Sequence, residues 1–327
     1  MQNRSTFHAQ QAANRRNSVL LILAVTLLLA VLGFAIGYGT TGYVEGAFGV
    51  TTGAIVLAML LSVGSYFAGD KLVLATSGAK EVSQESAPQL MNVVQEMAIA
   101  ANVPMPKVYI IEDTAPNAFA TGRDPKHASV AITTGLLQKL DREELQGVMG
   151  HELSHVRNFD IRFALLVAVL VGSIALLADF FLRFTFWGGG RRGGGDRDRG
   201  GGGLAAIMFI VAIVLAVIAP IIGRMVQLAV SRQREYLADS SSVELTRNPV
   251  GLERALAKIS SDREVLEVAN RATQHLYFTN PIKKFEERSS SLFSTHPAVL
   301  DRINRLRQLT GEGPLNPADV QALAGLD

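Results

Sequence analysis

The 327-residue chain contains no cysteine, which excludes disulfide bonds, zinc sites built from cysteine and thiol nucleophiles. Any metal ion would therefore be bound by His, Asp or Glu, and the chain has only 6 histidines. Charge is also scarce, because Asp, Glu, Lys and Arg make up 18% of the residues, against about 25% in an ordinary soluble protein. The formal net charge of +2 argues against a chain that binds nucleic acid over its whole surface.

The apolar residues are concentrated in four long runs, which predict two membrane-spanning helical hairpins. Uncharged runs at 19–38 and 47–68 are each long enough for a hydrocarbon core of about 30 Å. A second pair covers 163–182, which contains Asp179, and 204–223. Runs of this length are rare in the cores of soluble proteins, although buried helices remain the alternative, more so for the second pair.

Basic residues around the first hairpin predict its orientation. Arg15 and Arg16 precede it and Lys71 follows it, whereas the loop 39–46 contains neither Lys nor Arg. By the positive-inside rule, both ends of this hairpin are cytoplasmic. The loop of the second hairpin, 187–203, carries four arginines, so either the rule is overridden there or that pair does not cross fully. We expect a multi-pass protein of a bacterial-type inner membrane.

Between the two hairpins, the sequence predicts a helix followed by a small sheet. Apolar residues from Leu90 to Ala101 recur at helical spacing, and Pro104 and Pro106 end that pattern. Short runs rich in β-branched and aromatic residues come next, separated by turn residues. The strands are expected at 108–111, 118–121 and 129–133.

The next helix carries the residues on which the functional prediction depends. Asp141 fits a helix N-cap, with Glu144 as its reciprocal carboxylate. The motif His-Glu-Leu-Ser-His follows, in which His151 and His155 are one turn apart on one face, so both imidazoles can reach one metal ion. Glu152 is placed to take a proton from a water molecule at that metal.

A zinc site needs a third protein ligand, and the best candidate follows the fourth apolar run. Glu235 and Asp239 are one helical turn apart, so Glu235 can face the metal while Asp239 accepts a hydrogen bond from an imidazole N–H. A Glu and an Asp at this spacing usually lie on a solvated surface. Here two predicted spans separate them from the histidines in the sequence, and two spans return the chain to the side of the membrane on which the histidines lie. This agreement favours Glu235 as the third ligand.

Four motifs, in order along the chain, resemble the HtpX-like membrane zinc metalloproteases, relatives of the CAAX prenyl-protein peptidases. The resemblance implies a mainly α membrane protein, with two transmembrane hairpins and a gluzincin-type α+β metalloprotease domain that contains a small sheet. It implies one zinc ion per chain, bound by His151, His155 and Glu235, with Glu152 as the catalytic base. The motifs are Asn-Ala-Phe-Ala-Thr-Gly (117–122), His-Glu-Leu-Ser-His (151–155) with Asn158 and Asp160, Ser-Arg-Gln-Arg-Glu-Tyr-Leu-Ala-Asp (231–239) and Leu-Phe-Ser-Thr-His-Pro (292–297).

The resemblance also implies roles that spacing alone does not assign. His296 is the candidate for stabilising the oxyanion, with a capping or surface role as the alternative. Arg302, on the helix that follows, either braces the site or is solvated. The serine run 240–242 departs from the family, in which Ala and Gly are usual there. The segment implied to form an edge strand that pairs with extended substrate is Asn117, Ala118, Phe119 and Ala120.

The sequence therefore predicts a membrane-bound zinc endopeptidase, and the resemblance implies a cytoplasmic active site and misfolded or damaged membrane proteins as substrates. The alternatives are a membrane scaffold with a vestigial metal site, which the intact ligands disfavour, and a transporter, which needs more charges within its spans than Asp179. The expected partners are unfolded or membrane proteins and the lipid bilayer, without nucleic acid, and a homo-oligomer is compatible with the chain. The expected parts are an N-terminal segment with the first hairpin (1–80), a first catalytic part (81–161), the second hairpin (162–223) and a second catalytic part (224–327).

Overall fold

The structure is a computed structural model of the whole chain, and the chain divides into two compact units. The first unit, which holds the candidate site, comprises Met1–Asn14, Phe67–Leu165 and Leu228–Asp327. The second comprises Arg15–Tyr66 and Leu166–Gln227. Most of the second predicted hairpin, and His296, lie outside the described residues. The structure describes residues 7–164, 206–207, 209–214, 218, 234–262 and 297–325.

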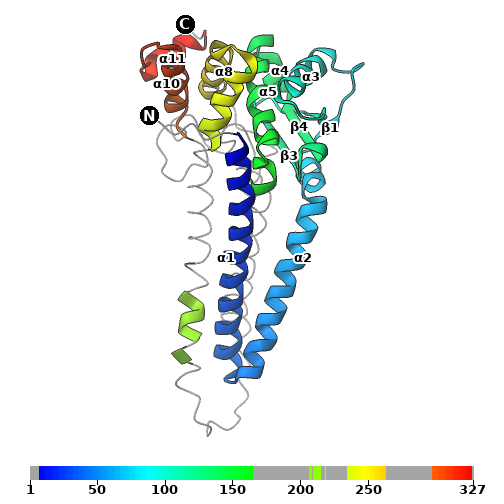
Figure 1. Cartoon of the computed structure of the whole chain (residues 1–327), viewed down its shortest axis with the longest axis vertical. Coiled ribbons are helices and arrows are strands. Elements are labelled where there is room, and N and C mark those ends of the chain that lie inside the picture. Colours follow the sequence, from blue (N-terminus) through cyan, green and yellow to red (C-terminus); the bar gives the residue numbers. More distant parts are fainter. Residues whose placement is uncertain are drawn as a thin grey trace. The chain divides into compact units, whose positions relative to one another are not determined.

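A four-stranded sheet with strand order β1-β2-β4-β3 belongs to the first unit (Figure 1). It confirms the three strands that the sequence predicts and adds the short β1. β1 and β2 are antiparallel, β2 and β4 are parallel, and β3 pairs with β4 in antiparallel register, so β3 is an edge strand. The strands are β1 (Lys80–Glu81), β2 (Lys107–Ile111), β3 (Ala118–Gly122) and β4 (Ala128–Thr133).

Helices cover the sheet and build the main core around α5 (Arg142–Arg157), which packs against α3, α8 and β3. The predicted capping box is present: the Glu144 N–H donates to Asp141 Oδ1 and the Asp141 N–H donates to Glu144 Oε2, each at 2.9 Å. The apolar stripe predicted from Leu90 to Ala101 is the buried face of α3. The other helices of this unit are α3 (Pro88–Ala101), the 3-10 helix η1 (Pro125–His127), α4 (Thr134–Lys139), α8 (Pro249–Ser261), α10 (Val299–Thr310) and α11 (Pro317–Leu323).

Two long helices, α1 (Phe7–Thr41) and α2 (Val44–Thr76), contribute residues 15–41 and 44–66 to the second unit. They approach closely at Gly37, where a Cβ atom would lie 2.7 Å from the Cα of Ala47. Counted over the described residues alone, no helix combines the length and the apolar character needed to cross a membrane. The spans that the sequence predicts therefore stay predictions.

Candidate metal centre

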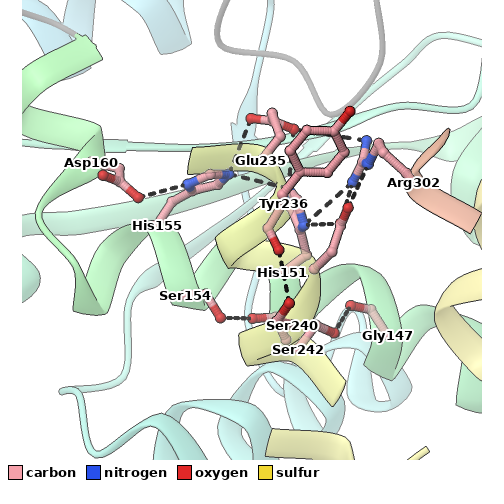
Figure 2. A network of polar contacts seen from close by, with 12 residues as sticks. Gly147, His151, Ser154, His155, Asp160, Glu235, Tyr236, Ser240, Ser242 and Arg302 are labelled. Carbon is pink, nitrogen blue, oxygen red and sulfur yellow. Dashed lines mark hydrogen bonds and ion pairs between the residues drawn. The ribbon is translucent and has the colours of Figure 1, made fainter. Parts of the chain in front are cut away.

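Two imidazoles and a carboxylate converge in the first unit. His151 and His155 project from one face of α5, and their Nε2 atoms are 3.1 Å apart (Figure 2). Glu235 lies on a helix formed by residues 234–246, and its Oε2 lies 3.5 Å from His151 Nε2 while its Oε1 lies 3.5 Å from His155 Nε2. One ligand atom from each of the three residues lies within 4.8 Å of the others. Two nitrogens bound to one tetrahedral zinc ion are about 3.3 Å apart, so this donor set fits zinc after a small movement.

The second ring nitrogen of each imidazole contacts a carboxylate. Asp239 Oδ1 is 2.9 Å from His151 Nδ1, which is the contact expected from the sequence. Asp160 Oδ2 is 3.1 Å from His155 Nδ1. An ionised carboxylate only accepts hydrogen bonds, so each Nδ1 donates to its carboxylate and Nε2 is the ring nitrogen that is directed toward a metal.

Arg302 of α10 is 1% exposed, which agrees with the bracing role and excludes the solvated one. Its Nε and Nη2 atoms donate to the two Asp239 oxygens at 2.9 and 2.6 Å, and its Nη1 lies 3.7 Å from Glu235 Oε2. Burial raises the pKa of Asp239, but Arg302 and His151 outweigh this effect and hold that pKa below its usual value. Asp239 is therefore a charged acceptor in the folded protein.

Glu152 is 2% exposed and lies beside the metal ligands. Burial raises the pKa of its carboxyl group, against the opposing effect of the two histidines and of a hydrogen bond from the Ala120 backbone. The Thr133 N–H donates to the Asn117 carbonyl at 3.0 Å, so strand alternation directs the backbone groups of Ala118 and Ala120 away from β4. Glu152 consequently contacts the free edge of β3.

Small residues let the two ligand-bearing helices approach. A Cβ atom on Gly150 of α5 would lie 2.9 Å from Ser242 Oγ, and the same hydroxyl donates to the Gly147 carbonyl at 2.6 Å (Figure 2). Contacts pair increasing positions on α5 with decreasing positions on the helix 234–246, so the two helices are antiparallel. The serine run that departs from the family pattern thus contributes a buried hydrogen bond that joins them.

The structure brings together most of the site residues named from the sequence and adds two. The spacing of Asp160 and Arg234 in the sequence indicates no role for them, yet Arg234 Nε lies 3.5 Å from Asp160 Oδ1, on the Nδ1 side of His155. His296, the oxyanion candidate, lies outside the described residues. The residues gathered around the site are His151, Glu152, His155, Glu235, Asp239 and Arg302, with Asn117, Ala118, Phe119 and Ala120 at the adjoining end of the sheet.

Comparisons with known proteins identify relatives of this chain. The sequence model of peptidase family M48 matches residues 84–310. A relative named "Protease HtpX homolog" from Streptococcus uberis is 44% identical over 302 residues, covering 92% of this chain and 99% of that protein. Proteins of the same name from Listeria monocytogenes serovar 1/2a and Thermoanaerobacter pseudethanolicus are 47% identical over 307 residues and 44% identical over 311 residues, covering 92% and 94% of this chain and 99% of each protein.

The crystal structure of Ste24p from S. mikatae aligns with a TM-score of 0.46 at 16% identity, covering 77% of this chain and 57% of that one. The family assignment rests on the sequence comparisons. The residues matched by the family model, 84–310, include His151, His155 and Glu235. The chain therefore belongs to peptidase family M48 and is a metalloprotease.

Proposed function

We propose that this chain is a membrane-bound zinc endopeptidase that hydrolyses peptide bonds in misfolded or damaged membrane proteins. The observation that carries the proposal is the convergence of His151, His155 and Glu235 beside the buried carboxyl group of Glu152. Two imidazoles and one carboxylate are a donor set of catalytic zinc sites, which keep a fourth position for water. The relatives named as HtpX protease homologs support the activity, and the choice of substrates follows from the resemblance.

The residues of the site divide the chemistry among them. A bound zinc ion supplies a Lewis acid that activates water and polarises the scissile carbonyl group. Glu152, as a carboxylate, accepts a proton from the attacking water and then delivers it to the leaving nitrogen. Glu152 lies beside the metal ligands and contacts the backbone of Ala120, which places its carboxyl group to move the proton in both steps. His296 is the proposed oxyanion donor.

The free edge of β3 is the proposed binding site for extended substrate. The backbone groups of Ala118 and Ala120 point to that edge, and the Ala120 N–H already contacts Glu152. A peptide strand added there would form main-chain hydrogen bonds and would place its scissile bond near the base. The sequence specificity of the backbone contacts would be low, which suits an enzyme that removes damaged proteins.

Large apolar side chains exposed along α1 and α2 support insertion of these helices in a bilayer. We propose that the active site is cytoplasmic, because the basic residues flank the first hairpin on one side. The side chains include Leu20, Leu23, Leu27, Phe48, Leu57, Leu60 and Val63.

The absence of cysteine makes the topology simple to test by single-cysteine labelling in intact cells. Tyr43→Cys, between α1 and α2, and Gly195→Cys, in the arginine-rich loop, should react with an impermeant thiol reagent from outside. His127→Cys, on the exposed η1, should react only after the cells are opened. Labelling of Gly195→Cys from the cytoplasmic side alone would reject two full crossings by the second hairpin.

The central test compares the full-length protein in detergent with Glu152→Gln. Both proteins should bind about one zinc ion, measured by mass spectrometry of the metal, and only the unmutated protein should cleave an unfolded substrate such as casein. Glu143→Gln is the matched control, because Glu143 is an exposed glutamate on the same helix. It should bind zinc and cleave as the unmutated protein does.

Two results would overturn the proposal. One is a freshly purified wild-type protein that holds no zinc, and the other is equal cleavage by wild type and Glu152→Gln. A membrane scaffold with a vestigial site predicts a third pattern, in which zinc is bound but no protein in the set cleaves.

A further inference from the structure

We propose that Asp160 and Arg234 form a positioning pair that orients His155 toward the metal. This inference rests on the proposed zinc site and gives a role to two residues that are not among the three proposed ligands. Neither residue belongs to the group of three candidate ligands: Asp160 contacts Nδ1 of His155, and Arg234 contacts Asp160. Both residues are therefore positioning residues.

The pair repeats, on the second imidazole, the arrangement found on the first. His155 Nδ1 contacts Asp160 (Figure 2), and Asp160 lies beside Arg234. In the same way, His151 Nδ1 contacts Asp239, which is held by Arg302. Each ligand imidazole thus has its own carboxylate, and each carboxylate has its own guanidinium. A carboxylate on Nδ1 fixes the tautomer and the ring orientation, and it makes Nε2 a stronger donor.

His155 depends on such support more than His151 does. The His155 side chain is 15% exposed, whereas the His151 side chain is 1% exposed and held by packing on all sides. Less packing leaves the ring of His155 more freedom to rotate, so the contact with Asp160, on the ring nitrogen opposite the other ligands, contributes to its orientation. Asp160 itself is 5% exposed. Burying a carboxylate is costly unless a hydrogen-bond or charged partner compensates it, which the contacts with His155 and Arg234 do.

The backbone before Asp160 adopts an unfavourable conformation that brings this carboxylate back to His155. α5 ends at residue 157, Asn158 caps it, and Phe159 has a φ of 61°, in the left-handed region that large side chains rarely adopt. This single left-handed residue breaks the helix and redirects the chain, after which residues 160–164 are helical again. A continuous helix would carry Asp160 away from the face occupied by His155.

Arg234 connects this turn to the third ligand. Its guanidinium lies over the ring of Phe163, 3.7 Å from the ring centroid, and its Nε atom is 3.5 Å from Asp160 Oδ1. Glu235 is the next residue along the chain. This ion pair therefore links the segment after α5, which orients His155, to the helix 234–246, which carries Glu235. Residues 165–233 separate the two segments in the sequence.

The test measures the zinc affinity of the full-length protein in detergent, by competition with a chelating dye. All variants carry Glu152→Gln, so that self-cleavage does not alter the samples. Asp160→Asn keeps the shape of the side chain and should weaken zinc binding by about 10 to 100-fold. Arg234→Met keeps the contact with Phe163 and should weaken binding by a smaller factor.

Asp262→Asn is the matched control, because Asp262 forms a 2.5 Å ion pair with Lys139 at the end of α8, away from the imidazoles. It should bind zinc within about twofold of the parent. A second readout separates orientation from general damage: after cobalt substitution, the ligand-field absorption bands should shift in Asp160→Asn and remain unchanged in Asp262→Asn.

Unchanged zinc affinity in Asp160→Asn would overturn the inference, as would an equal loss in Asp160→Asn and Asp262→Asn. If Asp160→Asn does not fold, Arg234→Met decides the matter, and parent-like zinc affinity and cobalt bands in that variant would overturn it. A parent protein that binds no zinc contradicts the proposed function instead, so the two failures are distinguishable.

Discussion

Among single residues, Arg302 has the greatest influence on the charge balance of the site. Its guanidinium is buried between Asp239 and Glu235, and its charge also acts on Glu152. Removing one member of a buried ion pair leaves an uncompensated charge away from water, which typically costs about 3 to 5 kcal/mol. The metal centre therefore depends on a residue outside its group of three candidate ligands.

Arg302→Met should lower the free energy of unfolding by about 3 to 5 kcal/mol and weaken zinc binding, because Asp239 would lose both hydrogen bonds from Arg302. Denaturant unfolding in detergent and zinc titration measure the two effects. Arg254→Met, at an exposed position on α8, is the control and should change stability by less than about 0.5 kcal/mol. Similar stability of the two variants would contradict the bracing role.

The pKa of Glu152 predicts how the metal-free protein responds to pH. Burial raises this pKa above the ordinary value of 4.5, so the folded protein binds the proton more tightly than the unfolded chain. This contribution to stability is complete below pH 4.5 and is lost as the pH rises through the raised pKa. Glu152→Gln removes the titration, because glutamine stays neutral.

With a chelator present, Glu152→Gln should therefore melt at a higher temperature than the wild type at pH 8. The difference should shrink as the pH falls and disappear near pH 4.5. Thermal melts at several pH values check this dependence. A constant difference across the range would show that the carboxyl group of Glu152 titrates normally.

At the scale of elements, local patterns predicted α5 and β3 well and the contacts at the ends of these elements less well. The capping box and the His-Glu-Leu-Ser-His spacing lie within one helix, so periodicity alone places His151 and His155. Asp160 was given no role because its position depends on the left-handed Phe159, a conformation that no local pattern of residues indicates. Arg302 required the packing of α10 to distinguish a brace from a solvated side chain.

The edge strand β3 gives a prediction that uses its alternation. Proline at Ala118 removes an N–H that points away from β4 and donates to Asn117 Oδ1 at 3.0 Å, whereas proline at Phe119 removes an N–H directed at β4. Ala118→Pro should keep the pairing of β3 with β4 and lower kcat/KM for a peptide about tenfold, because the N–H at this position could no longer exchange Asn117 Oδ1 for a substrate carbonyl. Phe119→Pro should unfold the sheet.

Peptide kinetics and thermal melts of the two proline variants are the measurements. Wild-type kcat/KM in a folded Ala118→Pro protein would argue that substrate does not pair with β3. Equal destabilisation by both substitutions would show that the two N–H groups do not differ in direction.

At the scale of the whole chain, the metal centre is assembled from three separated segments. α5 supplies two imidazoles, the helix 234–246 supplies Glu235, and α10 supplies Arg302. The spans predicted at 163–182 and 204–223 lie between the first two segments. Their even number indicates that both segments lie on one side of the membrane, but it does not give the distance between them. A ligand that bridges distant segments stabilises the folded state by mass action.

Zinc removal should therefore lower the melting temperature of the protein. At a free zinc concentration 1,000 times the Kd, the stabilisation is about 4 kcal/mol. Melts with and without EDTA measure it, zinc should restore the original value and magnesium should not. His155→Ala should abolish the response, and a variant that still responds fully would place the stabilising metal elsewhere.

The division of the site among three segments also sets an order of events during synthesis. When α5 leaves the ribosome, the chain has two imidazoles but neither Glu235 nor Arg302, so no complete metal centre exists. Arg302 is translated 67 residues after Glu235, since 302 − 235 = 67. Until Glu235 joins the two imidazoles the site lacks its third candidate ligand, so we expect no hydrolysis of neighbouring nascent chains before that point of synthesis.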